Sequence, residues 1–141
     1  MRPIEAIERD LDACAPGGDV AAAAARLLAL AEDVLEHWVG ARGQNPTSER
    51  REGFRLLALH QQGARDVPSF NACRETCREI AYHYNLLTLE PSEDDGRRLK
   101  MMEMLVRHLA LFVGGKTQVD GLGDFCCASK PLRREPATFD E

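Results

Sequence analysis

The chain has 141 residues, the size of a single domain that can bury a hydrophobic core without disulfides or metals. Its formal charge of −5, from 18 Lys and Arg against 23 Asp and Glu, argues against a nucleic-acid-binding module held by phosphate neutralisation. Hydrophobic residues make up 44% of the chain, but no apolar run approaches a membrane span and the N-terminus lacks a signal pattern. We therefore expect a cytoplasmic protein that binds neither nucleic acid nor membranes.

Helical periodicity predicts two helices in the first third of the chain. Residues 3–14 carry an apolar stripe at helical spacing and are followed by Pro16-Gly17-Gly18, which ends the segment. Asp19 is a suitable N-cap for the next helix, which is rich in alanine and runs to about Val39. The first stripe consists of Ile4, Ile7, Leu11 and Cys14.

Three more helices follow, and the periodicity then disappears. They are expected at about 46–63, 66–87 and 92–113, the last ending before Gly114-Gly115. Short connections between long helices imply antiparallel neighbours, so we predict an all-α, up-and-down bundle of four to five helices. The domain organisation is then a helical bundle over 1–113 and an irregular C-terminal tail over 114–141.

The predicted fourth helix has two contrasting faces. An apolar stripe that faces the core is formed by Phe70, Cys73, Cys77, Ile80, Tyr84 and Leu87. The opposite side is polar and carries arginine and an aromatic residue, which are the residue types that anchor interfaces. This side is either a solvated surface or a recognition surface. As candidate binding residues we take Asn71, Arg74, Arg78, Tyr82 and His83.

The predicted fifth helix is apolar on two sides. One face fits the core, and a second, roughly opposite, consists of Met101, Met104, Leu111 and Phe112 together with His108. A helix that is apolar nearly all round must be buried nearly all round. A bundle of this size can bury such a helix only at its centre or with a second subunit. Of these we expect a homodimer, or another homo-oligomer, that covers the second face.

Cys73 and Cys77 form the most chemically suggestive pair. Residues at i and i+4 of a helix have Cβ atoms about 5–6 Å apart, which is too far for an unstrained disulfide but suitable for ligands of one metal ion. His60, or Cys126 and Cys127, would then complete the metal site. The alternatives are thiol redox chemistry, or two small hydrophobic residues in the core, where free cysteines usually lie.

Other chemical motifs are missing. No Glu precedes a His by three residues, HExxH and CxxCH are absent, and Gly114 to Thr117 lacks the earlier glycine and the strand of a phosphate-binding loop. The sequence thus assigns no catalytic residue, and a metal ion is the one candidate cofactor.

Three functions remain open. The first is a small regulatory or adaptor protein that binds a protein partner. The second is a metal- or thiol-based sensor that uses Cys73 and Cys77. The third is an enzyme with a pocket between helices that performs acid–base chemistry. Its candidate residues are His37, His60, Arg74, Arg78, Tyr82 and His83.

Overall fold

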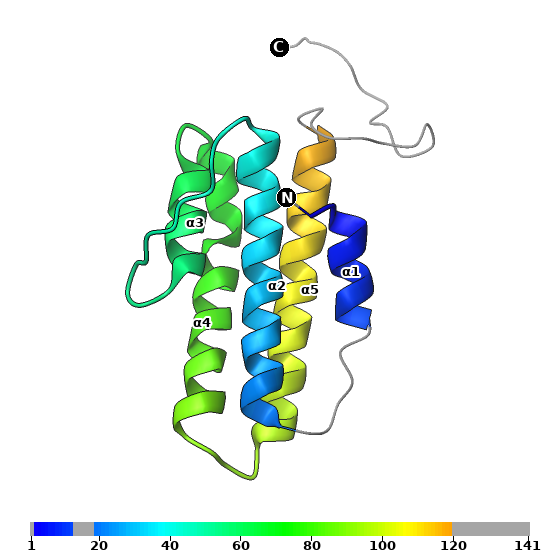
Figure 1. Ribbon diagram of the computed structural model, residues 1–141, viewed down its shortest axis with the longest axis vertical. Helices are drawn as coiled ribbons and strands as arrows, with labels where there is room; N and C mark the ends of the chain where they lie inside the picture. The colour runs from blue at the N-terminus through cyan, green and yellow to red at the C-terminus, as the bar shows by residue number, and fades with distance from the viewer. Residues whose placement is uncertain (1, 13–18, 120–141) are drawn as a thin grey trace.

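The computed structural model describes residues 2–12 and 19–119, which form a helical bundle (Figure 1). No strand occurs within these two ranges, so the predicted all-α class is confirmed. None of the helices described is both long and apolar enough to cross a membrane. The helices are α1 (Ile4–Asp12), α2 (Val20–Ala41), α3 (Arg55–Ala64), α4 (Arg74–Leu89) and α5 (Asp95–Val119), and a short 3-10 helix, η1 (Pro68–Cys73), precedes α4.

The helices alternate in direction except at one connection. α1 and α2 are antiparallel, and so are α3 and α4, and α4 and α5 (Figure 1). Residues 42–54, however, run back along the bundle, so that α3 points in the same direction as α2 (Figure 1). The short connection expected before the third helix is therefore replaced by a long returning segment.

Side chains from α3 hold this returning segment in place. The Gln62 side chain accepts a hydrogen bond from the Thr47 N–H at 2.8 Å and donates one to the Asn45 carbonyl at 2.8 Å. Arg55 donates to the Thr47 carbonyl and forms an ion pair with Glu36 of α2. The third helix therefore begins at Arg55, and its predicted start at 46–48 was wrong because those polar residues are bound in the loop instead.

The returning segment ends in a tight turn. Arg51 and Phe54 exchange both backbone hydrogen bonds, each at 2.9 Å. The two residues between them have positive φ, 54° at Glu52 and 86° at Gly53, as a type I′ turn requires. This turn presents the Glu52 side chain to α4.

α5 is longer than expected. It passes through Gly114-Gly115 and ends at Val119, so the predicted end at Val113 was wrong. Val113 and Thr117 are both buried, and the Thr117 hydroxyl donates to the Val113 carbonyl at 2.7 Å. Tertiary packing thus overrides the low helix propensity of glycine. Residues 120–141 lie outside the described ranges, so the division into bundle and tail remains a prediction.

The aromatic core is organised around Phe70 of η1. Its ring stacks on Trp38 of α2 with centroids 4.7 Å apart, and lies 5.4 Å from His60 of α3 and 5.9 Å from Phe112 of α5. Phe112, which we had assigned to the second apolar face of the fifth helix, therefore packs against the core instead.

Gly63 allows this close packing. The Trp38 indole N–H donates to the Gly63 carbonyl at 2.9 Å. A Cβ on Gly63 would lie 2.8 Å from Trp38 Cδ1 and 3.0 Å from Phe70 Cε2. Only glycine therefore fits between these two rings without moving them.

We predict that Gly63→Ala lowers the free energy of unfolding by about 1–3 kcal/mol, because the new methyl group overpacks the Trp38–Phe70 stack. The measurement is chemical denaturation followed by circular dichroism. Gly96→Ala is the matched control, since a Cβ there meets no atom within 4 Å. Equal stability of both variants would contradict the prediction.

Candidate functional site

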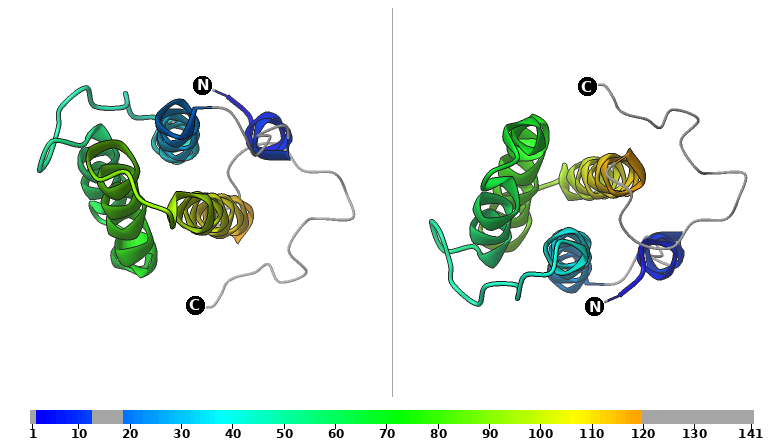
Figure 2. Two further views of the ribbon diagram at one scale, coloured as in Figure 1. Left: turned by 90° about the horizontal axis from the view of Figure 1, so that it is seen from below. Right: turned by 90° about the horizontal axis from the view of Figure 1, so that it is seen from above.

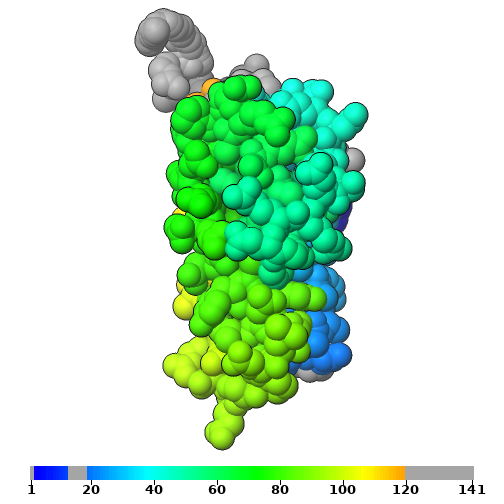
Figure 3. Space-filling model, turned by 90° about the vertical axis from the view of Figure 1, so that its left-hand side faces the viewer, coloured from blue at the N-terminus to red at the C-terminus, as the bar shows by residue number. Residues whose placement is uncertain are grey.

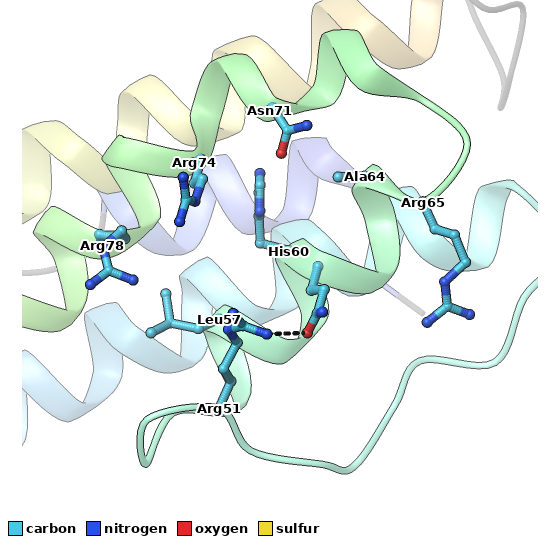
Figure 4. Close-up of a pocket in the computed structure, with 9 residues that line it drawn as sticks. Arg51, Leu57, His60, Ala64, Arg65, Asn71, Arg74 and Arg78 are labelled. Carbon is cyan, nitrogen blue, oxygen red and sulfur yellow. Dashed lines mark hydrogen bonds between the residues drawn. The ribbon is translucent and has the colours of Figure 1, made fainter.

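A pocket of about 320 Å³ lies between α3 and the start of α4 (Figure 4). It draws on three separate parts of the chain: the turn before α3, α3 with the residue that follows it, and the start of α4 with η1. No Asp or Glu is among its lining residues. Its polar lining includes Arg51, Arg65, Arg74, Arg78, His60 and Asn71.

Helical spacing explains how η1 and α4 contribute to the pocket. Asn71, Arg74 and Arg78 are separated by three and four residues, so they share one side of the chain as it passes from η1 into α4. In Figure 4, Asn71 and Arg74 lie on either side of His60, which rises from α3. Three of the predicted binding residues and one predicted metal ligand thus line a single pocket.

Most of the positive charge in this pocket is not neutralised by nearby acids. Arg78 pairs with Glu52 at 3.1 Å, whereas Arg51 donates to the amide oxygen of Gln61 at 2.9 Å. Among the residues that the structure describes, no carboxylate forms an ion pair with Arg51, Arg65 or Arg74. The pocket is therefore suited to an anionic group.

Glu52 is the acidic residue that forms an ion pair with this cluster. The hydrogen bond from Arg78 lowers the pKa of the Glu52 carboxyl, and the charges of Arg51 and Arg74 lower it further. In return, Glu52 raises the pKa of Arg78. Glu52 is thus a carboxylate of the chain itself that pairs with Arg78 at the edge of the pocket.

Tyr82 lies farther along α4, beside a second hollow. Its side chain is 57% exposed, and it lines this hollow of about 310 Å³ with Glu75, Glu79 and Arg78. Because Arg78 borders both hollows, they adjoin each other. They belong to the face formed by α3, α4 and the returning segment, which Figure 3 shows. Along this face, the arginine-lined pocket is therefore followed by a hollow in which the Tyr82 ring lies among the carboxylates of Glu75 and Glu79.

His83 is not part of either hollow. Its Nδ1 donates to the Glu79 carbonyl of its own helix at 2.8 Å, and its ring lies edge-on to Tyr82 with centroids 5.7 Å apart. His83 thus contacts Tyr82 and lines neither of these two hollows, and its predicted binding role stays a prediction.

The predicted metal ligands lie inside the core. Cys73, Cys77 and His60 are buried, and both His60 Nε2 and the Cys73 thiol donate to the Phe70 carbonyl, at 3.1 and 3.3 Å. Within residues 2–12 and 19–119, no group of three His, Cys, Asp or Glu side chains is placed to hold a metal ion. The metal site remains a prediction without structural support, and its other candidate ligands, Cys126 and Cys127, lie outside the described residues.

The two thiols differ in acidity. The Cys77 thiol stabilises the Cys73 thiolate by a hydrogen bond and His60 also favours it, which lowers the pKa of Cys73 to about 6 despite burial. The same pairing with Cys73, together with burial, raises the pKa of Cys77. Cys73 is therefore the more acidic of the two thiols, and its hydrogen bond to Phe70 is made by the protonated form.

No known protein family, curated protein or solved structure matches this chain. The site is thus defined by its geometry. Sequence reasoning missed Arg51, Gln61 and Arg65, because they come from a loop and a helix that meet α4 only in the folded chain. The adjacent Arg50 and Arg51, beside the turn-forming Gly53, were the available signal.

We predict that one thiolate forms as the pH rises through about 6, well below the range near 8.5 that is usual for cysteine. Thiolate absorbance in the ultraviolet, followed during a pH titration, measures it. Cys73→Ser should remove this step and Cys126→Ser should leave it. Titration of every thiol near its ordinary pKa would contradict the prediction.

Proposed function

We propose that the protein is a small adaptor that binds another protein, and that the arginine-lined pocket receives a carboxylate side chain of that partner. The observation that carries the proposal is the uncompensated charge of Arg51, Arg65 and Arg74 around a pocket without lining acids. Like charges that lie close together repel one another, and a bound anion relieves this repulsion.

A carboxylate suits the chemistry of this lining. Guanidinium groups donate paired hydrogen bonds to carboxylates, and such charge-assisted bonds are stronger than neutral ones. The Asn71 side chain adds a neutral polar group, and the neighbouring Tyr82 adds an exposed aromatic surface of the kind that anchors protein interfaces. The face thus combines a charged anchor with an aromatic one.

We predict that Arg74→Ala weakens binding of an acidic peptide by about tenfold or more, since the loss of a charge-assisted hydrogen bond costs about 1.5–3 kcal/mol. The probe is a fluorescent peptide of alternating Glu and Tyr, followed by anisotropy at low salt. Arg97→Ala is the matched control, because Arg97 is 80% exposed and does not line the pocket. Equal affinity of both variants would refute the proposed role of the pocket.

We predict that Glu52→Gln strengthens binding of the same peptide several-fold. The internal carboxylate then no longer competes for Arg78, while the shape of the residue is kept. Glu49→Gln is the control, as Glu49 is an exposed acid of the same loop that lines none of the hollows described above. Weaker binding by Glu52→Gln would show that Glu52 orients Arg78 rather than competing with the ligand.

We also propose that two copies of the chain associate through the outer side of α5. α1, α2 and α4 pack against the other sides of α5, and among the helices described none lies on its remaining side in the end-on views (Figure 2). The outer stripe is exposed and, at about 100° per residue, occupies about 80° of the helix circumference. It consists of Met101, Met104, His108, Leu111, Gly115 and Val119.

A second copy is a suitable partner for this stripe. Met104 and Leu111 are 62% and 68% exposed, although most large apolar side chains of the bundle are covered. A straight stripe along one helix can pair with itself about a two-fold axis, which is the commonest symmetry of soluble oligomers. The stripe spans about 27 Å from Met101 to Val119, five turns of helix.

We predict that the protein is a dimer at micromolar concentration and that Met104→Glu makes it monomeric. A charge at this position would have to be buried in the interface without a partner. Size-exclusion chromatography with light scattering measures the mass. Leu89→Glu is the control, because Leu89 is 72% exposed at the end of α4 and is not part of the stripe. A monomeric wild-type protein would refute this contact.

A further inference from the structure

Cys73 and Cys77 are two free thiols at the start of α4. They are separated by four residues and both belong to the main hydrophobic core, with 2% and 0% exposure. Neither lines the arginine pocket. Their chemistry is therefore not used by the proposed binding function.

The backbone at Cys73 is favourable for a bond between them. Cys73 is the last residue of η1 and the N-cap of α4, with φ −99° and ψ 11°, so it is not held in α-helical geometry. The strain expected for a disulfide between i and i+4 applies to the middle of a helix, where the two Cβ atoms are about 5–6 Å apart. At a helix end, the residue before the first turn can move without breaking the bonds of the turns that follow.

We propose that Cys73 and Cys77 are a reversible redox site, in which hydrogen peroxide converts the two thiols into an intramolecular disulfide. Peroxide is small and uncharged, so it suits a buried site. His60, which lines the arginine pocket, donates to the same Phe70 carbonyl as the Cys73 thiol. The His60 side chain therefore connects the pocket with the surroundings of Cys73.

The reaction has two steps. The Cys73 thiolate attacks one peroxide oxygen, the O–O bond breaks, and the departing hydroxide takes a proton to become water, which leaves a sulfenic acid on Cys73. The Cys77 thiol then loses its proton, and its sulfur attacks the Cys73 sulfur. The S–O bond breaks, and the leaving hydroxide accepts that proton as water. Overall, two thiols lose two electrons and one peroxide is reduced to two waters.

The surroundings favour Cys73 as the residue that attacks first. The Cys77 thiol and His60 stabilise the Cys73 thiolate, whereas Cys77 remains protonated. Thiolates, and not thiols, are the nucleophiles in this chemistry. Cys77, one helical turn farther along α4, is then the resolving cysteine.

Peptide mapping of the folded wild-type chain tests the proposal directly. Trypsin cleaves after Arg65, Arg74 and Arg78, so Cys73 and Cys77 fall in separate peptides, 66–74 and 75–78. After peroxide treatment and alkylation of the remaining thiols, we expect these peptides as one linked species, lighter than their sum by two hydrogen atoms. A thiol reductant should separate them again.

Two variants sharpen this experiment. In Cys77→Ser, Cys73 should stop at the sulfenic acid, which dimedone traps. In a chain with Cys14, Cys126 and Cys127 all replaced by serine, the linked peptides should still form. The proposal is overturned if the two peptides stay unlinked in folded wild-type protein, or if they are linked only to peptides that contain the other three cysteines. Neither result depends on the arginine pocket. Failure of the redox proposal would therefore leave the adaptor proposal standing, and failure of the adaptor proposal would leave the redox proposal standing.

Discussion

The arrangement of the bundle depends on the insertion of one aromatic side chain, Phe70, between the long helices. Its ring stacks on Trp38 and lies beside His60. The stack of Phe70 on Trp38 is possible because Gly63 has no side chain at the point where these two rings approach α3. The Phe70 carbonyl then accepts hydrogen bonds from His60 and Cys73. A single residue therefore packs the core with its ring and orients two polar groups with its backbone.

The candidate site follows from this insertion. Since η1 is anchored through Phe70, whose ring contacts His60 of α3, Asn71 and Arg74 also lie beside α3 and line the pocket with His60. The returning segment supplies Arg51 to the pocket and Glu52 to its edge, from a turn whose backbone requires positive φ at two successive residues. The pocket thus combines a rigid wall, fixed by the core, with a wall formed by a loop and held through side-chain hydrogen bonds.

The sequence predicted the parts of this structure that depend on local periodicity. The all-α class and the buried stripe of α4, including Cys73 and Cys77, were correct because helical spacing reports directly on which side faces the core. The predicted start of α3 and the predicted end of α5 were wrong, since the hydrogen bonds of the Gln62 side chain and the burial of Thr117 arise only from tertiary contacts. For the same reason Arg51 and Arg65 could not be grouped with Arg74 before the fold was known.

The two proposed binding surfaces are compatible with each other. The arginine pocket is lined by residues of α3, η1, α4 and the returning segment, and none of its lining residues belongs to α5. The outer stripe of α5 therefore can be covered by a second copy while the pocket stays open. A dimer formed in this way would display two identical pockets, and two linked sites bind a partner with repeated acidic segments more tightly than one. If the protein is an adaptor as proposed, this geometry would give it selectivity for such partners even where each single contact is weak.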